Sequence, residues 1–195
     1  MKMNRTVKLL MISDIFVISG FGLITPIMAV FINDKIIGGT IFTAGIASAV
    51  FMVTKGIIQL PFSSYVDSHN DKDGLKWLIT GTILIACVPF LYIFSKTIFH
   101  IYFAEFIFGV GSGLAYPTWL GVWSRNLDGQ KESFQWSLYS TFVAIGMAIS
   151  AALGAGIAEF LGFKFTFVFV GLMTMIGCAI VFYLRKTMKK KRKKR

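Results

Sequence analysis

Apolar residues run along this chain in six long stretches that are separated by short polar connections. Each stretch reaches the roughly 20 predominantly apolar residues that an α-helix needs to cross a bilayer. The predicted spans are Leu9–Ile32, Ile41–Val66, Trp77–Ser95, His100–Ser124, Ser133–Phe160 and Phe165–Leu184. Because the connections leave no room for a soluble domain, the pattern predicts an all-α polytopic membrane protein with six transmembrane helices.

The composition agrees with this prediction and argues against a soluble domain, a nucleic-acid-binding protein and a metal or disulfide protein. Of the 195 residues, 55% are hydrophobic and 15% are charged, and the mean hydropathy is +0.71, which is too apolar for one small soluble domain. The formal net charge of +11 would suggest nucleic acid in a soluble protein, but beside apolar spans it indicates a membrane surface, and no nucleic-acid partner is expected. Cys87 and Cys178 lie in apolar runs without metal-ligand spacing, so neither a metal site nor a disulfide is expected.

The basic residues fall mainly on one side of the predicted spans. The two ends and the even-numbered connections together carry sixteen Lys and Arg residues, against Lys35, Lys96 and Lys164 on the other side. The positive-inside rule therefore predicts that both termini are cytoplasmic, in a plasma (inner) membrane protein. Residues 189–195 are all basic, and we expect a disordered cytoplasmic tail that is attracted to anionic lipid headgroups.

The chain repeats itself at an offset of 91 residues. A G-x-G-L-x-x-P motif at 20–26 recurs at 111–117, and the same offset relates the pairs Asp14 and Glu105, Cys87 and Cys178, and Tyr92 and Tyr183. Three spans separate equivalent positions, so the two halves must have opposite orientations in the membrane. This predicts a 3+3 inverted repeat within a domain of residues 1–188, with repeats at about 7–96 and 98–187. The alternative is that the motif reflects ordinary helix packing by small residues and proline.

Three charged residues lie inside the predicted spans at least five residues from either end: Asp14, Lys55 and Glu105. Such residues cost about 2.5–3.5 kcal/mol at a helix centre on insertion scales, so they are usually paired or functional. With Lys55 between the two acids in depth, we interpret them as a proton or ion relay, and a static ion pair remains the alternative. Helical spacing from these groups predicts cavity-lining residues, for which interhelical packing is the alternative: Phe21, Thr25, Gln59, Ser112 and Tyr116.

Small residues and prolines are assigned to helix packing. Gly146, Ser150 and Gly154 have the small-xxx-small spacing that lets helix backbones approach closely. The other residues assigned to packing are Gly22, Pro26, Gly109, Gly113 and Pro117. The glycines at 109, 111 and 113 lack the spacing of a dinucleotide fingerprint and lie inside a span, so no cofactor is expected.

With the spans and the repeat placed, the chain resembles one six-helix half of a major facilitator superfamily transporter, and drug:proton-antiporter-like members most of all. The connection after the second span, Ser63-Ser64-Tyr65-Val66-Asp67 followed by Gly74-Leu75-Lys76, resembles the family's G-x-L-a-D-[RK]-x-G-[RK] loop. The resemblance implies a gating loop formed by Asp67, Gly74 and Lys76. The run from Glu105 to Gly111 resembles the family's R-x-x-q-G-x-g pattern in helix 4, with glutamate in the place of arginine, and Gly162-Phe163-Lys164 with Phe167 resembles the opening of helix 6.

The resemblance implies a half-size secondary active transporter that moves a small solute by alternating access, coupled to protons or another cation. Complete members have two such halves, so this chain is expected to pair with a second copy or with another half-transporter. The alternative is a membrane scaffold or regulator that keeps the half-fold without transporting. An intramembrane hydrolase is not expected, because Asp14 and Glu105 lie at different depths, too far apart to share a proton.

Overall fold

The computed structural model describes residues 3–69 and 71–193, and the regular structure of these residues is helical. The helices are α1 (Arg5–Gly22), α2 (Met28–Lys35), α3 (Ile41–Ser68), α4 (Asp71–Phe94), α5 (Ile98–Asn126), α6 (Glu132–Phe160) and α7 (Phe163–Lys193). Five of them, α3 to α7, contain stretches that are long and apolar enough to cross a membrane. The chain is therefore an integral, multi-pass membrane protein.

The first predicted span is not one continuous helix, so the prediction that Leu9–Ile32 forms a single helix is wrong. Helix α1 ends at Gly22 and α2 begins at Met28, and the residues between them form turns. Pro26 explains the break, because a proline has no backbone N–H to donate and its ring crowds the carbonyl group four residues earlier, here that of Gly22. The equivalent proline of the second motif, Pro117, lies inside the continuous helix α5.

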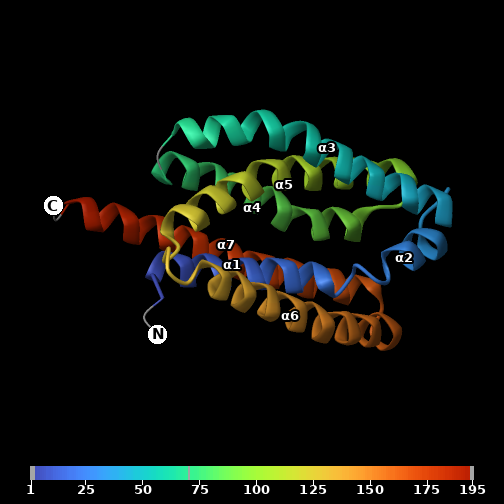
Figure 1. Ribbon diagram of the computed structural model, residues 1–195. Helices are drawn as coiled ribbons and strands as arrows, with labels where there is room; N and C mark the ends of the chain where they lie inside the picture. The colour runs from blue at the N-terminus through green and yellow to red at the C-terminus, as the bar shows by residue number, and fades with distance from the viewer. Residues whose placement is uncertain (1–2, 70, 194–195) are drawn as a thin grey trace.

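The helices form two layers, with both described ends of the chain at the same end of the bundle (Figure 1). Helix α5 packs against α3 and α4 in one layer, and α1 packs against α6 and α7 in the other. The contact between α4 and α7 is the most extensive one between the layers, and α1 also touches α5. Each layer thus combines helices from the first and the second half of the chain.

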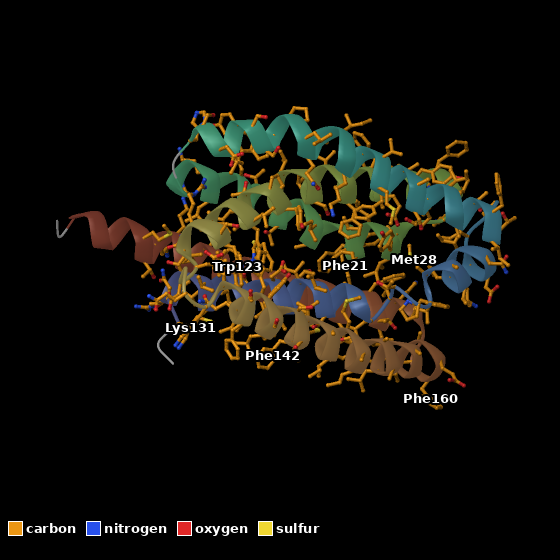
Figure 2. The ribbon with its side chains drawn as sticks, in the orientation of Figure 1. Phe21, Met28, Trp123, Lys131, Phe142 and Phe160 are labelled. Atoms are coloured by element: carbon orange, nitrogen blue, oxygen red, sulfur yellow. The ribbon has the colours of Figure 1, made fainter. Side chains whose placement is uncertain are left out.

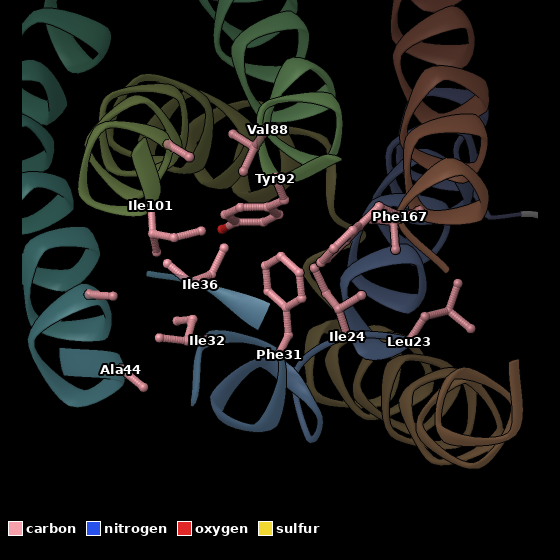
Figure 3. Close-up of a cluster of buried hydrophobic side chains, with 13 residues drawn as sticks. Leu23, Ile24, Phe31, Ile32, Ile36, Ala44, Val88, Tyr92, Ile101 and Phe167 are labelled. Carbon is pink, nitrogen blue, oxygen red and sulfur yellow. The ribbon is translucent and has the colours of Figure 1, made fainter. Parts of the chain in front are cut away.

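Two clusters of buried apolar side chains hold the layers together. One cluster lies around α2 and includes Phe31, Tyr92 and Phe167, which come from α2, α4 and α7 (Figure 3). The other cluster lies toward the termini and includes Leu10 of α1 and Trp123 of α5. Buried residues of this second cluster, among them Ala115 and Trp119, line the cavity described below.

Helices α3 and α6 bury very little of their length. Only three residues of each are buried, and both helices present large apolar side chains outward. Leu60 of α3 is 74% exposed, and Phe142 and Phe160 lie on the outer side of α6 (Figure 2). In a membrane these faces contact lipid or other apolar protein surfaces.

The ends of two helices differ from the sequence prediction. Helix α4 begins at Asp71, so Gly74 and Lys76 lie in its first turns and Asp67 lies in the last turn of α3. The residues of the predicted gating loop therefore lie within the ends of two helices. Helix α7 continues to Lys193, so residues 189–193 of the expected disordered tail 189–195 are helical, and 194–195 lie outside the described residues. Lysine and arginine are good helix formers and are favoured near a helix C-terminus, which explains the longer helix.

The glycines assigned to packing lie where helices meet closely. A Cβ atom added at Gly109 or Gly113 of α5 would lie 2.6 Å from Thr54 Cβ or 2.8 Å from Ile58 Cβ of α3. At the contact between α1 and α6, a Cβ at Gly22 would lie 3.2 Å from Ser150 Cβ, and one at Gly146 would meet Ser19. Close approach of the backbones is therefore possible only because these positions lack a side chain.

We expect Gly154→Ala to destabilise the bundle. The added Cβ would lie 2.6 Å from Leu23 Cα, so α6 must move away from the turn after α1. Overpacking of this kind lowers the free energy of unfolding by about 1–3 kcal/mol. Gly156→Ala, two residues along the same helix, is the matched control, because no atom lies within 4 Å of its added Cβ. Unfolding in mixed micelles measures both variants, and equal stabilities would contradict this account of the contact.

Candidate functional site

A cavity of about 310 Å³ lies between the two helical layers. Helices α1 and α5 supply most of its lining, and α3, α4, α6 and α7 complete it. Six of the residues singled out in the sequence line it: Asp14, Phe21, Thr25, Lys55, Ser112 and Tyr116. Gln59 and Glu105 are not among its lining residues.

Asp14 is held in the cavity wall by a tyrosine from the neighbouring helix. The hydroxyl group of Tyr139, on α6, donates a hydrogen bond to Asp14 Oδ2, on α1. Both residues line the cavity and both are partly buried. The carboxylate is thus fixed in position while it remains accessible from the cavity.

Lys55 extends into the same cavity from α3. Its Nζ lies 4.8 Å from the centre of the Tyr116 ring, which is a cation–π contact. Among the side chains that the structure describes, no carboxylate lies within salt-bridge distance of this ammonium group. Asp14 and Lys55 therefore face one cavity without being paired with each other.

Glu105 occupies a separate, buried position nearer the α2 end of the bundle. Its Oε1 accepts a hydrogen bond of 2.8 Å from the hydroxyl group of Tyr92, and the glutamate is only 7% exposed. The bond joins α5 to α4 inside one layer. Asp14, Lys55 and Glu105 are thus each in contact with a tyrosine.

Aromatic side chains bound the cavity at both ends. Phe108 is stacked between Phe21 and Phe51, with a centroid distance of 4.3 Å to each, so that α1, α3 and α5 meet there. Toward the termini, four rings from α5 and α6 form an aromatic cluster: Trp119, Trp123, Trp136 and Tyr139. Figure 2 shows Phe21 and Trp123 in the region between the two layers.

The sequence does not single out Tyr139, nor Phe108 and Phe51, which complete the aromatic stack with Phe21. Tyr139 follows Trp136 by three residues, so the two rings share a helix face, and a hydroxyl group on that face was the available signal. Phe51 and Phe108 carried no such signal, because phenylalanines are common throughout the apolar spans. Their role depends on how α3 and α5 lie beside α1.

The cavity has the features of a small-molecule site rather than a metal centre. Its volume is at the lower end of the range of about 300–1,000 Å³ that is typical of ligand pockets, and its lining is apolar with a few polar groups. No group of three or more His, Cys, Asp or Glu side chains is placed to hold a metal ion in the described part of the chain. The arrangement provides one carboxylate and one ammonium group in an aromatic chamber.

Comparison with known proteins places this architecture in a family. Residues 10–195 match the sequence model of the Major Facilitator Superfamily. An uncharacterized MFS-type transporter of Methanocaldococcus jannaschii is 21% identical over 184 residues, which cover 94% of this chain and 46% of the relative. The quinolone resistance protein NorA of Staphylococcus aureus is 23% identical over 176 residues, which cover 90% of this chain and 44% of the relative. The chain therefore spans about half the length of the curated relatives that it matches.

Proposed function

The chain belongs to the Major Facilitator Superfamily, and from this membership we propose that it supplies one six-helix half of a secondary active transporter for a small solute. The cavity between the two layers is the observation that carries the proposal. It brings an acidic and a basic residue from different helices to one chamber, and such groups within membrane spans typically mark solute or ion pathways. Transport by alternating access needs a site of this kind between elements that can move relative to each other.

The packing of the helices supports an inverted repeat as the basis of this movement. In this proposal α1 and α2 together make the first of six crossings, and the offset of 91 residues pairs α1 with α5, α3 with α6, and α4 with α7. These pairs relate one layer to the other. The contacts of α1 with α6 and α7 in one layer correspond to the contacts of α5 with α3 and α4 in the other. The contact between α4 and α7 and the contact between α1 and α5 each map onto themselves when the members of each pair are exchanged.

We place both termini in the cytoplasm, with the protein in the plasma (inner) membrane. The excess of basic residues on the side of the termini supports this orientation. The basic segment at the end of α7 then lies beside anionic lipid headgroups. Asp67, Gly74 and Lys76 would form the cytoplasmic gate between α3 and α4, through their helix ends rather than through a long loop.

Coupling to protons is assigned to Asp14, Lys55 and Glu105. Asp14 and Lys55 share the cavity, so a proton on Asp14 weakens its attraction for Lys55 and shifts the balance between two helix arrangements. Glu105 lies outside the cavity, and we propose it as a second proton site. Because it accepts a hydrogen bond from Tyr92, its protonation would change the packing of α4 against α5.

A second six-helix bundle is required to complete the pathway. The length of the relatives supports this requirement, because each has about twice the matched length. The exposed apolar faces of α3 and α6 are suited to contact such a bundle. We propose a second copy of the chain or a separate half-transporter as the partner.

Reconstitution in liposomes tests the proposed function. Native mass spectrometry of the purified chain in nanodiscs first counts its copies, and two are expected. A fluorescent quinolone, chosen because of the quinolone resistance relative, is then offered with and without a proton gradient. We expect accumulation that depends on the gradient and is absent from empty liposomes. Two copies without any flux of the probe above that background would count against transport of this class of solute.

A further inference from the structure

The cavity contains a cation that no carboxylate of the described side chains contacts directly. Lys55 contacts the ring of Tyr116, while Asp14, the acidic residue of the same cavity, accepts its hydrogen bond from Tyr139. An ammonium group inside a membrane is costly unless a negative partner compensates it, and contact with an aromatic ring compensates only in part. Lys55 therefore has no direct anionic partner among the described side chains, although Asp14 lines the same cavity.

The rest of the cavity wall is suited to flat apolar groups. Aromatic rings from four helices line it, and they are Phe21, Phe51, Phe108, Tyr116, Trp119 and Tyr139. Aromatic side chains pack favourably against other rings, in offset stacks or edge to face. A ligand that fills this chamber gains most if it presents a ring system to these walls.

From these two observations we propose that the solute is a planar aromatic molecule with an anionic group, and that this group pairs with Lys55. The inference rests on the proposed function, since it names the class of solute that the transport pathway accepts. The second charged residue of the cavity fits this assignment. When Asp14 carries a proton, Lys55 is the only charged residue among those that line the chamber, so the proton and the anion favour each other's binding.

Three probes that share one ring system and differ in charge test the proposal: 1-naphthoate, 1-naphthylmethylammonium and 1-naphthalenemethanol. Binding is measured by equilibrium dialysis with the full chain in nanodiscs, and binding to empty nanodiscs is subtracted. We expect naphthoate to bind about tenfold or more tightly than the neutral and cationic probes, because a charge-assisted pair is the strongest polar contact that the cavity offers.

Variants of the cavity assign this preference to Lys55. Lys55→Gln should remove the preference for naphthoate, and Lys55→Arg should keep it. Asp14→Asn, which imitates the protonated acid, should tighten naphthoate binding. Lys96→Gln is the matched control, because Lys96 is a lysine outside the cavity. The neutral probe reports whether the cavity survives in each variant, since its binding does not depend on a charge.

Two results would overturn the inference: naphthoate binding that Lys55→Gln leaves unchanged, or tighter binding of the cationic probe. The outcome is separable from that of the proposed function. If naphthoate binding depends on Lys55 but no flux is seen in liposomes, the proposed ligand class is supported and the proposed transport is contradicted. If flux is proton-driven but the anionic probe is not preferred, the proposed transport is supported and the proposed ligand class is contradicted.

Discussion

Asp14→Asn is expected to abolish proton-driven accumulation of the transported solute. Asparagine has nearly the same size as aspartate, and its amide oxygen can still accept the hydrogen bond from Tyr139. The variant therefore keeps the cavity wall but cannot bind or release a proton. We expect gradient-driven accumulation to fall by about tenfold or more, to the level of empty liposomes, as for loss of a functional ionisable group within a membrane.

The control for this variant is Asp34→Asn, on the exposed surface of α2, where Asp34 bonds only to the neighbouring Asn33 among the described hydrogen bonds. It should transport like the unmodified chain. Exchange of solute without a proton gradient should persist in Asp14→Asn, because this exchange requires the cavity but not the proton. If Asp14→Asn still showed full gradient-driven accumulation, Asp14 would have no role in proton coupling.

Tyr139→Phe distinguishes the effect of the position of the Asp14 carboxylate on transport from the effect of its charge. This variant keeps the aromatic ring in its cluster and keeps Asp14, but it removes the hydroxyl group that holds Asp14 Oδ2. An intermediate loss of accumulation therefore indicates that positioning matters, whereas the loss in Asp14→Asn reports the proton itself. The two variants together distinguish coupling from simple disturbance of the cavity.

The charged residues of the site could be found from the sequence because charge is rare in apolar spans. Asp14, Lys55 and Glu105 stand out for that reason alone. Their tyrosine partners could not be found in the same way, because each lies on another helix or more than ten residues away along the chain. Which side chain meets which depends on the rotation and depth of the helices, and these follow from packing that a single sequence does not specify.

The same limit applies to the backbone of the first span. The apolar run from Leu9 to Ile32 correctly marks a hydrophobic segment, but its hydropathy carries no information on whether Pro26 bends the helix or breaks it. Pro117 occurs in the same motif and lies inside α5. Local sequence thus gives the same signal for two outcomes, and the surroundings of each proline decide between them. The close helix contacts, in contrast, could be anticipated from glycines spaced along one face.

Trp123 connects the two layers at the end of the cavity nearer the termini. Its side chain is fully buried, and its ring lies 4.9 Å from Trp119, 5.5 Å from Trp136 and 5.3 Å from Tyr139. Helices α5 and α6 belong to different layers, so these rings supply a bridge between the layers. Tyr139 belongs to the same cluster and holds Asp14, which places the bridge in direct contact with the proposed proton site.

Trp123→Ala is therefore expected to cause the largest loss of stability of any variant considered. Removal of a fully buried tryptophan side chain lowers the free energy of unfolding by about 3–5 kcal/mol, because it leaves a cavity and ends several ring contacts. The indole nitrogen has no hydrogen-bond partner in the structure, so the loss reflects packing alone. Unfolding in mixed micelles measures it. Trp77→Ala is the control, since Trp77 is only partly buried and packs against Phe62 and Tyr65 beside the same end of the bundle. A smaller loss for Trp123→Ala than for Trp77→Ala would show that the cluster does not hold the layers together.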